Sequence, residues 1–209
     1  MLFLLKNCIS RLLERNMPNL DSFVRIPRDR IGILVGPEGK TKTYLETRLK
    51  IKLEVDSQDG GIAIVLTEEQ TDPSMLLRAK DLVTAIGRGF APEVAFRLIR
   101  NEDDVFDLVD LRLVFGRSDS DIKRIKGRII GAEGKTRRLI EELTEANITV
   151  YGHTIGIIGS YEEADAARHA VQMIIEGCEH KSVYKFLQRK RTEMKKEKMQ
   201  LWETPAKDR

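Results

Sequence analysis

The chain has 209 residues, of which 41% are hydrophobic and 33% are charged, and its formal net charge is +3. That length is typical of one to two domains. The net charge is too small to indicate nucleic-acid binding by itself, so the distribution of charge must decide. Cys8 and Cys178 have no neighbours at metal-ligand spacing, which argues against structural zinc and against a disulfide framework. No apolar run approaches the roughly 20 residues that span a bilayer, and we expect a cytoplasmic protein that does not associate with membranes.

Residues 1–16 form an extension before the first predicted domain. The apolar run from Leu2 to Leu5 ends at Lys6, which makes it shorter than the roughly 7–15 residues of a signal-peptide core. Ile9, Leu12 and Leu13 would share a helix face, as in a short amphipathic helix. Two other interpretations stay open: a disordered extension, or a natural translation start at Met17.

The first half of the chain predicts strand, helix, glycine loop, helix, strand, strand and helix, in that order. Alternating or helical spacing of the apolar residues defines each element. The expected strands are 23–26, 51–55 and 62–66, and the expected helices are 29–35, 40–50 and a last one opened by Asp72-Pro73. Within the helix after the loop, we expect Tyr44, Leu45 and Leu49 to face inward.

The second half repeats this order. The expected strands are 105–113, 148–150 and 154–158, and the expected helices are 119–130, 135–146 and 161–177. Two copies of one unit at a fixed spacing indicate an internal repeat. A connecting helix is expected over 93–100, and a basic final helix is expected to be capped by Ser182. The predicted division is an extension at 1–16, domain one at 17–88, a linker at 89–103, domain two at 104–180, and a basic helix and tail at 181–209.

Each copy carries a glycine loop, Gly36-Pro-Glu-Gly39 or Gly131-Ala-Glu-Gly134, followed by Lys-Thr. A P-loop that binds nucleotide phosphates requires Gly-x-x-x-x-Gly-Lys-Ser/Thr between a strand and a helix. Leu34 and Ile129 stand where the first glycine of that motif must be, and the preceding residues are helical in pattern. The sequence therefore disfavours an NTPase.

A Gly-x-x-Gly loop between two helices fits a different ligand. The missing Cβ atoms let the backbone approach a sugar-phosphate chain, and the free N–H groups of the next helix point at the phosphates. The run Ile129-Ile-Gly-Ala-Glu-Gly-Lys135, followed by Ile140, resembles the core signature of KH domains of the eukaryotic type, β-α-α-β-β-α. Such modules clamp about four nucleotides of single strand. The resemblance implies an α+β fold with two tandem KH domains, each a three-stranded sheet packed on helices.

Charge separates the two copies. Residues 122–138 hold seven cations and one acid, a net charge of +6, whereas residues 25–42 hold five cations and two acids, a net charge of +3. Phosphate contacts supply most of the sequence-independent affinity for nucleic acids. Pro37 also removes a backbone donor from the first loop, and Glu38 and Glu133 should weaken phosphate contact at both. We predict that the second copy is the stronger RNA clamp and that the first either binds RNA or serves as a packing or protein-binding surface.

The candidate RNA-binding residues follow from these loops and from the basic start of the final helix. In the second copy they are Arg124, Arg128, Ile129, Ile130, Gly131, Ala132, Glu133, Gly134, Lys135, Thr136, Arg137 and Arg138; in the first, Gly36, Pro37, Glu38, Gly39, Lys40 and Lys42; in the final helix, Lys185 and Arg189. None of the three histidines has a companion at metal-ligand spacing, and no nucleophile–base pair or carboxylate pair stands out. We expect no catalysis, no metal and no cofactor.

Segments outside the KH signature resemble one family, the archaeal two-KH-domain relatives of Partner-of-Nob, a small-subunit ribosome assembly factor. They are Arg88-Gly-Phe-Ala-Pro-Glu-Val-Ala-Phe-Arg-Leu98, Ile125-Lys-Gly-Arg-Ile-Ile-Gly131 and Ser182-Val-Tyr-Lys-Phe-Leu187. The resemblance implies binding near the 3′ end of small-subunit ribosomal RNA during its maturation. It also implies partnership with the Nob endonuclease and with the alpha subunit of archaeal initiation factor two. Two alternatives stay open: a general KH adaptor for the exosome or mRNA, and a protein-interaction scaffold.

Overall fold

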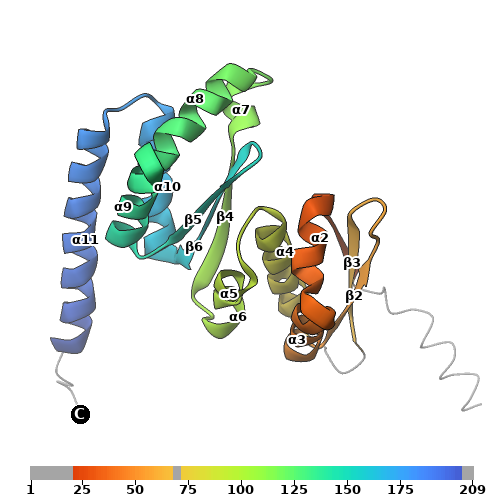
Figure 1. The fold of residues 1–209 in the computed structure, drawn as a ribbon. Helices are drawn as coiled ribbons and strands as arrows, with labels where there is room; N and C mark the ends of the chain where they lie inside the picture. The colour runs from red at the N-terminus through yellow and green to blue at the C-terminus, as the bar shows by residue number, and fades with distance from the viewer. Residues whose placement is uncertain (1–20, 68–71, 204–209) are drawn as a thin grey trace, which may run out of the picture.

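The first half of the chain folds as one three-stranded sheet with helices on one face (Figure 1). The computed structural model describes residues 21–67 and 72–203, so the expectations for residues 1–16 lie outside the described part. Strand order is β1-β3-β2, and both pairings are antiparallel. The elements are β1 (Asp21–Arg25), α2 (Arg28–Val35), the 3₁₀ turn η1 (Pro37–Gly39), α3 (Lys40–Leu49), β2 (Ile51–Val55), β3 (Gly61–Leu66) and α4 (Pro73–Gly87).

The second half repeats the arrangement, with strand order β4-β6-β5, again antiparallel. Its elements are β4 (Asp104–Asp110), α7 (Leu111–Phe115), α8 (Asp119–Ile130), η2 (Ala132–Gly134), α9 (Lys135–Thr144), β5 (Asn147–Tyr151), β6 (Thr154–Ser160), α10 (Tyr161–Ile175) and α11 (His180–Glu203). The predicted α+β class with two β-α-α-β-β-α units is confirmed. No helix within residues 21–67 and 72–203 is long and apolar enough to cross a membrane.

The strand predicted over 105–113 is wrong at its end. Strand β4 stops at Asp110, whose carboxylate accepts a hydrogen bond from the Arg112 backbone N–H at 2.8 Å and so caps the short helix α7. The alternation of apolar residues therefore does not continue: Leu111 is buried, but Leu113 is 87% exposed on α7. Helix α7 is an addition to the second unit, because β1 leads almost directly into α2 in the first.

Three smaller expectations also need correction. The connecting helix is two short helices, α5 (Pro92–Ala95) and α6 (Arg97–Arg100), which meet at Phe96. Ser182 does not cap the final helix, because α11 already begins at His180. Leu45 and Leu49 are buried as expected, but Tyr44 is 40% exposed and contacts the Phe96 ring, with 4.6 Å between centroids. The linker is therefore packed onto the first unit.

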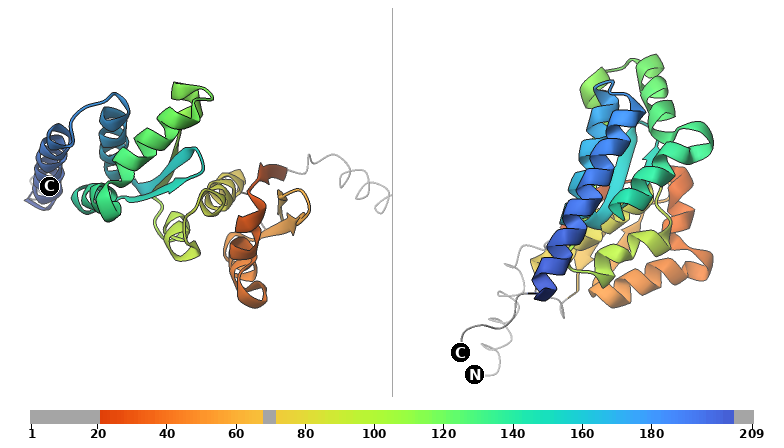
Figure 2. Two further views of the ribbon diagram at one scale, coloured as in Figure 1. Left: turned by 45° about the horizontal axis from the view of Figure 1, so that its top comes forward. Right: turned by 90° about the vertical axis from the view of Figure 1, so that its left-hand side faces the viewer.

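The sheet of the second unit is buried on both faces. Ile155 and Ile157 of β6 point into the core under the helices of the second unit, whereas Ile158 points the opposite way and joins the apolar cluster of the first. Phe90 of the linker lies on this outer face and contacts Phe106 of β4 edge to face, with 6.3 Å between centroids. The linker thus contributes to an apolar core that the two units share. Figure 2 shows the two units side by side.

A polar contact fixes the two units at a second point. Arg30 of α2 donates hydrogen bonds to the carbonyls of Ile86 (2.9 Å) and Phe90 (2.6 Å), and its guanidinium lies over the ring of Tyr151 in β5. The Tyr151 hydroxyl donates to the Asp29 carboxylate at 2.6 Å, and this hydrogen bond raises the pKa of Tyr151. The start of α2 is therefore joined directly to the edge strand of the second sheet.

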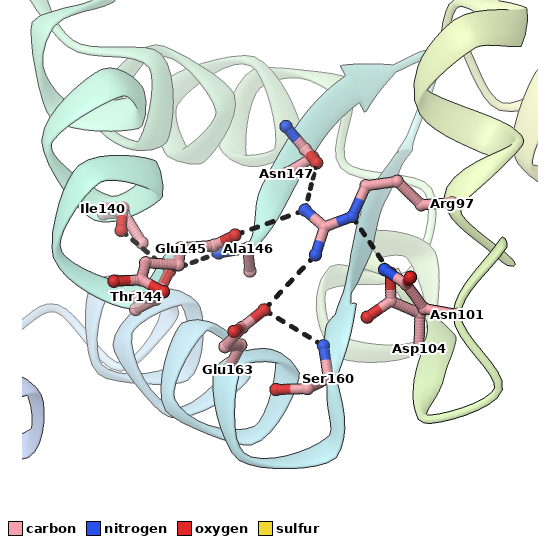
Figure 3. Close-up of polar contacts among 10 residues, drawn as sticks. All are labelled: Arg97, Asn101, Asp104, Ile140, Thr144, Glu145, Ala146, Asn147, Ser160 and Glu163. Carbon is pink, nitrogen blue, oxygen red and sulfur yellow. Dashed lines mark hydrogen bonds and ion pairs between the residues drawn. The ribbon is translucent and has the colours of Figure 1, made fainter. Parts of the chain in front are cut away.

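Arg97 of α6 is the centre of the largest polar cluster between the linker and the second unit (Figure 3). Its guanidinium contacts the carboxylates of Asp104 at 3.0 Å and Glu163 at 3.4 Å, both almost completely buried. It also donates to the Asn147 side-chain oxygen at 2.7 Å and to the Glu145 carbonyl at 3.3 Å. Arg97 thus connects the linker to β4, β5 and the start of α10.

Candidate nucleic-acid interface

The two glycine loops have nearly the same backbone. Gly131 has φ 71° and ψ 179°, and Gly36 has φ 72° and ψ 174°. The third residue of each loop, Glu133 or Glu38, is left-handed at φ 52° or 54°. The last glycine, Gly134 or Gly39, is also left-handed. Each loop therefore ends one helix and starts the next within four residues.

The first glycine of each loop is required by both conformation and space. Its φ and ψ lie in a region that is essentially restricted to glycine. A Cβ on Gly131 would lie 2.3 Å from the Thr136 hydroxyl oxygen, and a Cβ on Gly36 would lie 2.2 Å from that of Thr41. The last glycine of each loop would meet no such contact. Thr136, predicted as an RNA contact, therefore packs beneath the loop.

The second loop offers backbone donors to an anion. Ala132 and Glu133 form the tip of the loop between α8 and α9, and neither backbone N–H donates a hydrogen bond to another described residue. Helix α9 starts at Lys135, directly after Gly134, so the positive end of its dipole lies at the loop. In the first loop Pro37 takes the place of Ala132 and has no N–H to offer.

The cations of the second copy fall into two groups. Lys123 and Lys135 are exposed and, within residues 21–67 and 72–203, make no ion pair. Others are held by the protein: Arg124 pairs with Asp121 at 3.3 Å, Arg137 lies 3.7 Å from Glu141, Arg138 donates to the Glu133 carbonyl, and Lys126 donates to the Gly152 carbonyl at 2.7 Å. The exposed pair of Arg124 exchanges easily with a phosphate, because surface ion pairs are weak.

Arg128 has a structural position. Its guanidinium donates to the carbonyls of Ile174 (3.0 Å), Cys178 (2.5 Å) and Gly177 (3.5 Å), where α10 ends. A cation at these carbonyls is favourable because they form the negative end of the helix.

We expect Arg128→Ala to lower the free energy of unfolding by about 1–3 kcal/mol, the usual cost of losing hydrogen bonds to a charged group, while the salt dependence of RNA binding stays unchanged. Lys135→Ala should do the opposite: unchanged stability and a log–log salt slope that is smaller by about 0.7, the value for one phosphate contact in a single strand. Urea unfolding and salt-titrated anisotropy check the two variants. A reduced salt slope for Arg128→Ala would contradict this assignment.

The two isoleucines before the loop have different environments. Ile129 is completely buried in the core of the second unit, whereas Ile130 is 37% exposed. Both were predicted to contact RNA, but only Ile130 presents apolar surface to a base. Ile129 instead packs α8 onto the core of the second unit and so fixes the position of the loop that follows it.

The cations of the first loop are paired. Lys40 lies 2.9 Å from the Glu38 carboxylate, and Lys42 lies 3.8 Å from Glu46 one turn later. Pro37 leaves the first loop with fewer free backbone donors than the second, whereas the exposed pair of Lys40 exchanges with a phosphate as readily as the pair of Arg124 does.

Helix α11 supports the second loop, a relation that sequence patterns did not reveal. The Tyr184 hydroxyl lies 3.2 Å from the hydroxyl of Thr136, and His180 Nε2 donates to the Arg128 carbonyl at 2.9 Å. Lys185, next to Tyr184, is exposed, and so is Arg189, which lies 3.8 Å from Glu193. The structure thus brings the start of the basic helix beside the loop. Throughout the described residues, no group of three potential metal ligands is present.

Comparison with known proteins places this geometry in a family. Residues 105–192 match the family model described as a eukaryotic-type KH domain (KH-domain type I), and residues 27–101 match that of the Krr1 KH1 domain. The KH domain-containing protein MJ0443 of Methanocaldococcus jannaschii is 45% identical over 179 residues, which cover 86% of this chain and 78% of that protein. The RNA-binding protein pno1 of Dictyostelium discoideum is 29% identical, covering 77% and 67%. The chain belongs to the archaeal two-KH-domain branch of the Partner-of-Nob family.

A solved structure of a Partner-of-Nob relative extends the comparison. The crystal structure of the a/eIF2alpha–aDim2p–rRNA complex from Pyrococcus horikoshii contains a chain that is 40% identical, with a TM-score of 0.77, covering 86% of this chain and 98% of that one. The two KH units of this Partner-of-Nob protein therefore share the arrangement of a solved archaeal relative.

Proposed function

We propose that this chain binds single-stranded RNA near the 3′ end of small-subunit ribosomal RNA during its maturation, with the second KH domain as the main clamp. The observation that supports this most strongly is the second loop, where the amides of Ala132 and Glu133 and the cation Lys135, at the start of α9, have no partner among the described residues. A backbone phosphate would accept from the amides. Exposed Ile130 and the edge strand β5 would bound the bases.

The proposed contacts follow the geometry. Residues 131–135 would contact the sugar-phosphate chain, together with the cations Arg124, Arg137 and Arg138. Lys185 and Arg189 would make further phosphate contacts. The first domain would make a weaker contact through 36–40 and Lys42. Proposed domain limits are 17–88 and 104–180, joined by 89–103. The protein acts by binding, not by catalysis, in the cytoplasm.

The relatives supply the biological context of the proposal. One solved relative is in a complex with rRNA and a/eIF2alpha, and other relatives are named pre-rRNA-processing proteins. The alpha subunit of archaeal initiation factor two and a Nob-type endonuclease are accordingly the proposed protein partners.

Fluorescence anisotropy with single-stranded oligonucleotides from the 3′ end of small-subunit rRNA, and with scrambled versions, tests the proposal at several salt concentrations. Ala132→Asp with Glu133→Asp should weaken binding at least tenfold, about 1.4 kcal/mol, because the new carboxylate lies where the phosphate binds. The matched control, Pro37→Asp with Glu38→Asp, adds the same charge to the first loop and should change affinity less than threefold.

Each outcome selects one interpretation. Unchanged affinity in the second-loop variant would reject that loop as the clamp. Equal affinity for native and scrambled strands would favour a general adaptor for the exosome or mRNA. No RNA binding by the unmodified chain would favour a protein-interaction scaffold.

A further inference from the structure

A threonine packs beneath each glycine loop, at the same position in both copies. Thr136 and Thr41 each lie five residues after the first glycine of their loop. A Cβ on that glycine would lie 2.3 Å from the Thr136 hydroxyl oxygen and 2.2 Å from the Thr41 hydroxyl oxygen. The first glycine therefore rests on this side chain, and the orientation of the threonine sets the space below the loop.

The two threonines differ in their surroundings. Thr136 is 5% exposed, and its hydroxyl lies within hydrogen-bond distance of the Tyr184 hydroxyl in α11. Thr41 is half-buried, and its hydroxyl makes no hydrogen bond to a described residue. In the first unit α4 leads into the linker, so within residues 21–67 and 72–203 that unit has no counterpart of α11 (Figure 1). A buried hydroxyl requires a partner, and Tyr184 supplies it to the second loop.

The Tyr184 side chain is itself held in place. Val183 and Leu187, on the same helix, are completely buried in the core of the second unit. The His180 ring, one turn earlier, lies against the Tyr184 ring with 6.1 Å between centroids. His180 also contacts the Arg128 carbonyl near the end of α8. The phenol is therefore fixed by its own neighbours, which is what a residue that orients another side chain requires.

The orientation of Thr136 affects the phosphate donors directly. Without the phenol, the Thr136 side chain is free to adopt its other staggered rotamers. Rotation would turn a different group toward Gly131, where the space is already too small for one more carbon atom. Gly131 is followed by the amides of Ala132 and Glu133, which have no acceptor among the described residues. A change beneath the loop is thus transmitted to these amides.

We infer that Tyr184 is a positioning residue of the second RNA clamp. It fixes the Thr136 hydroxyl and, through it, the orientation in which the loop amides receive a phosphate. This inference rests on the proposed binding of RNA at that loop. A loop that is ordered before its ligand arrives binds more tightly, because less conformational freedom is lost on binding. Tyr184 therefore strengthens the second clamp relative to the first independently of charge and of Pro37.

A double-mutant cycle in RNA affinity tests this role in the full chain, by fluorescence anisotropy. Tyr184→Phe and Thr136→Val each remove one hydroxyl with little change in volume. Each should weaken RNA binding by about three- to tenfold, the range for the loss of one hydrogen bond. The double variant should bind about as weakly as either single variant, because both substitutions remove the same contact.

Tyr161→Phe is the matched control for the loss of a tyrosine hydroxyl. Tyr161 is 74% exposed at the start of α10 and makes no hydrogen bond to a described residue, so RNA affinity should be unchanged. Full affinity in Tyr184→Phe would overturn the inference. Losses that multiply in the double variant would also overturn it, because they would show that Tyr184 acts on RNA without Thr136.

Amide relaxation measured by NMR without RNA separates this inference from the proposed function. In Tyr184→Phe, the order parameters of the Ala132 and Glu133 amides should fall from the rigid value of about 0.85 toward the flexible range below about 0.6. Those of Glu38 and Gly39 in the first loop should not change. Unchanged order parameters at Ala132 and Glu133 would overturn the positioning role whatever the RNA affinity. A fall in these values, together with no RNA binding by the unmodified chain, would reject the proposed function and still support the positioning of the loop by Tyr184.

Discussion

Replacing Arg97 by alanine is expected to lower the free energy of unfolding by about 3–5 kcal/mol, the cost of breaking a buried ion pair by removing one partner. The carboxylates of Asp104 and Glu163, both almost completely buried, would each lose the guanidinium. The Glu163 carboxylate also accepts from the Ser160 backbone N–H at 3.1 Å in the capping box of α10. Loss of the guanidinium would leave this carboxylate less firmly oriented and so weaken the cap. Urea unfolding followed by circular dichroism measures the loss.

Arg100→Ala is the matched control, because Arg100 lies on the same short helix and is exposed to solvent. Its unfolding free energy should stay within about 0.5 kcal/mol of the unmodified protein, as is usual for surface substitutions. A loss of less than about 1 kcal/mol for Arg97→Ala, the size of a weak surface ion pair, would show that the cluster does not hold the linker to the second unit.

Replacing Gly131 by alanine is expected to be the most damaging single change in the RNA site. The backbone conformation would cost about 1–3 kcal/mol in any residue other than glycine, and the new Cβ would lie 2.3 Å from the Thr136 hydroxyl oxygen. The loop must then move, which displaces the amides of Ala132 and Glu133. We expect at least a tenfold loss of RNA affinity together with a lower unfolding free energy, measured by anisotropy and by urea unfolding.

Gly127→Ala is the control for this substitution. Gly127 lies one turn earlier in α8, where a new Cβ would have no neighbouring atom within 4 Å, and its φ is not positive. Alanine there should stabilise the helix by about 0.5–1 kcal/mol and leave RNA affinity unchanged. Full RNA affinity in Gly131→Ala would show that the loop tolerates displacement and would contradict its role as a rigid clamp.

Local patterns in the sequence predicted most of the fold. The apolar alternation of Ile51 and Leu53 against Lys52 and Glu54, and the helical spacing before each glycine pair, depend on neighbours only a few residues away. The loops were recognisable because the first position of each needs a positive φ, which favours glycine, and both copies have glycine there. Repetition then separated this motif from chance.

What the sequence did not predict depends on contacts between distant segments. Asp110 ends β4 because its side chain caps α7, a choice that alternation alone does not reveal. Arg128 has the sequence context of a phosphate ligand, yet its guanidinium donates its hydrogen bonds to carbonyls about 50 residues away. Ile158 falls in the strand predicted over 154–158, and only the position of the linker shows that it faces a second core.

The position of that linker has a consequence for synthesis on the ribosome. Chains emerge N-terminus first, and domains generally fold as they emerge. Residues 89–101 leave the exit tunnel before β4, β5 and β6, and they are already anchored through Arg30, which binds the Phe90 carbonyl. The second sheet therefore forms against linker residues that are already in place. Phe106 and Ile158 are covered as soon as the strands pair, which protects them from aggregation with other nascent chains.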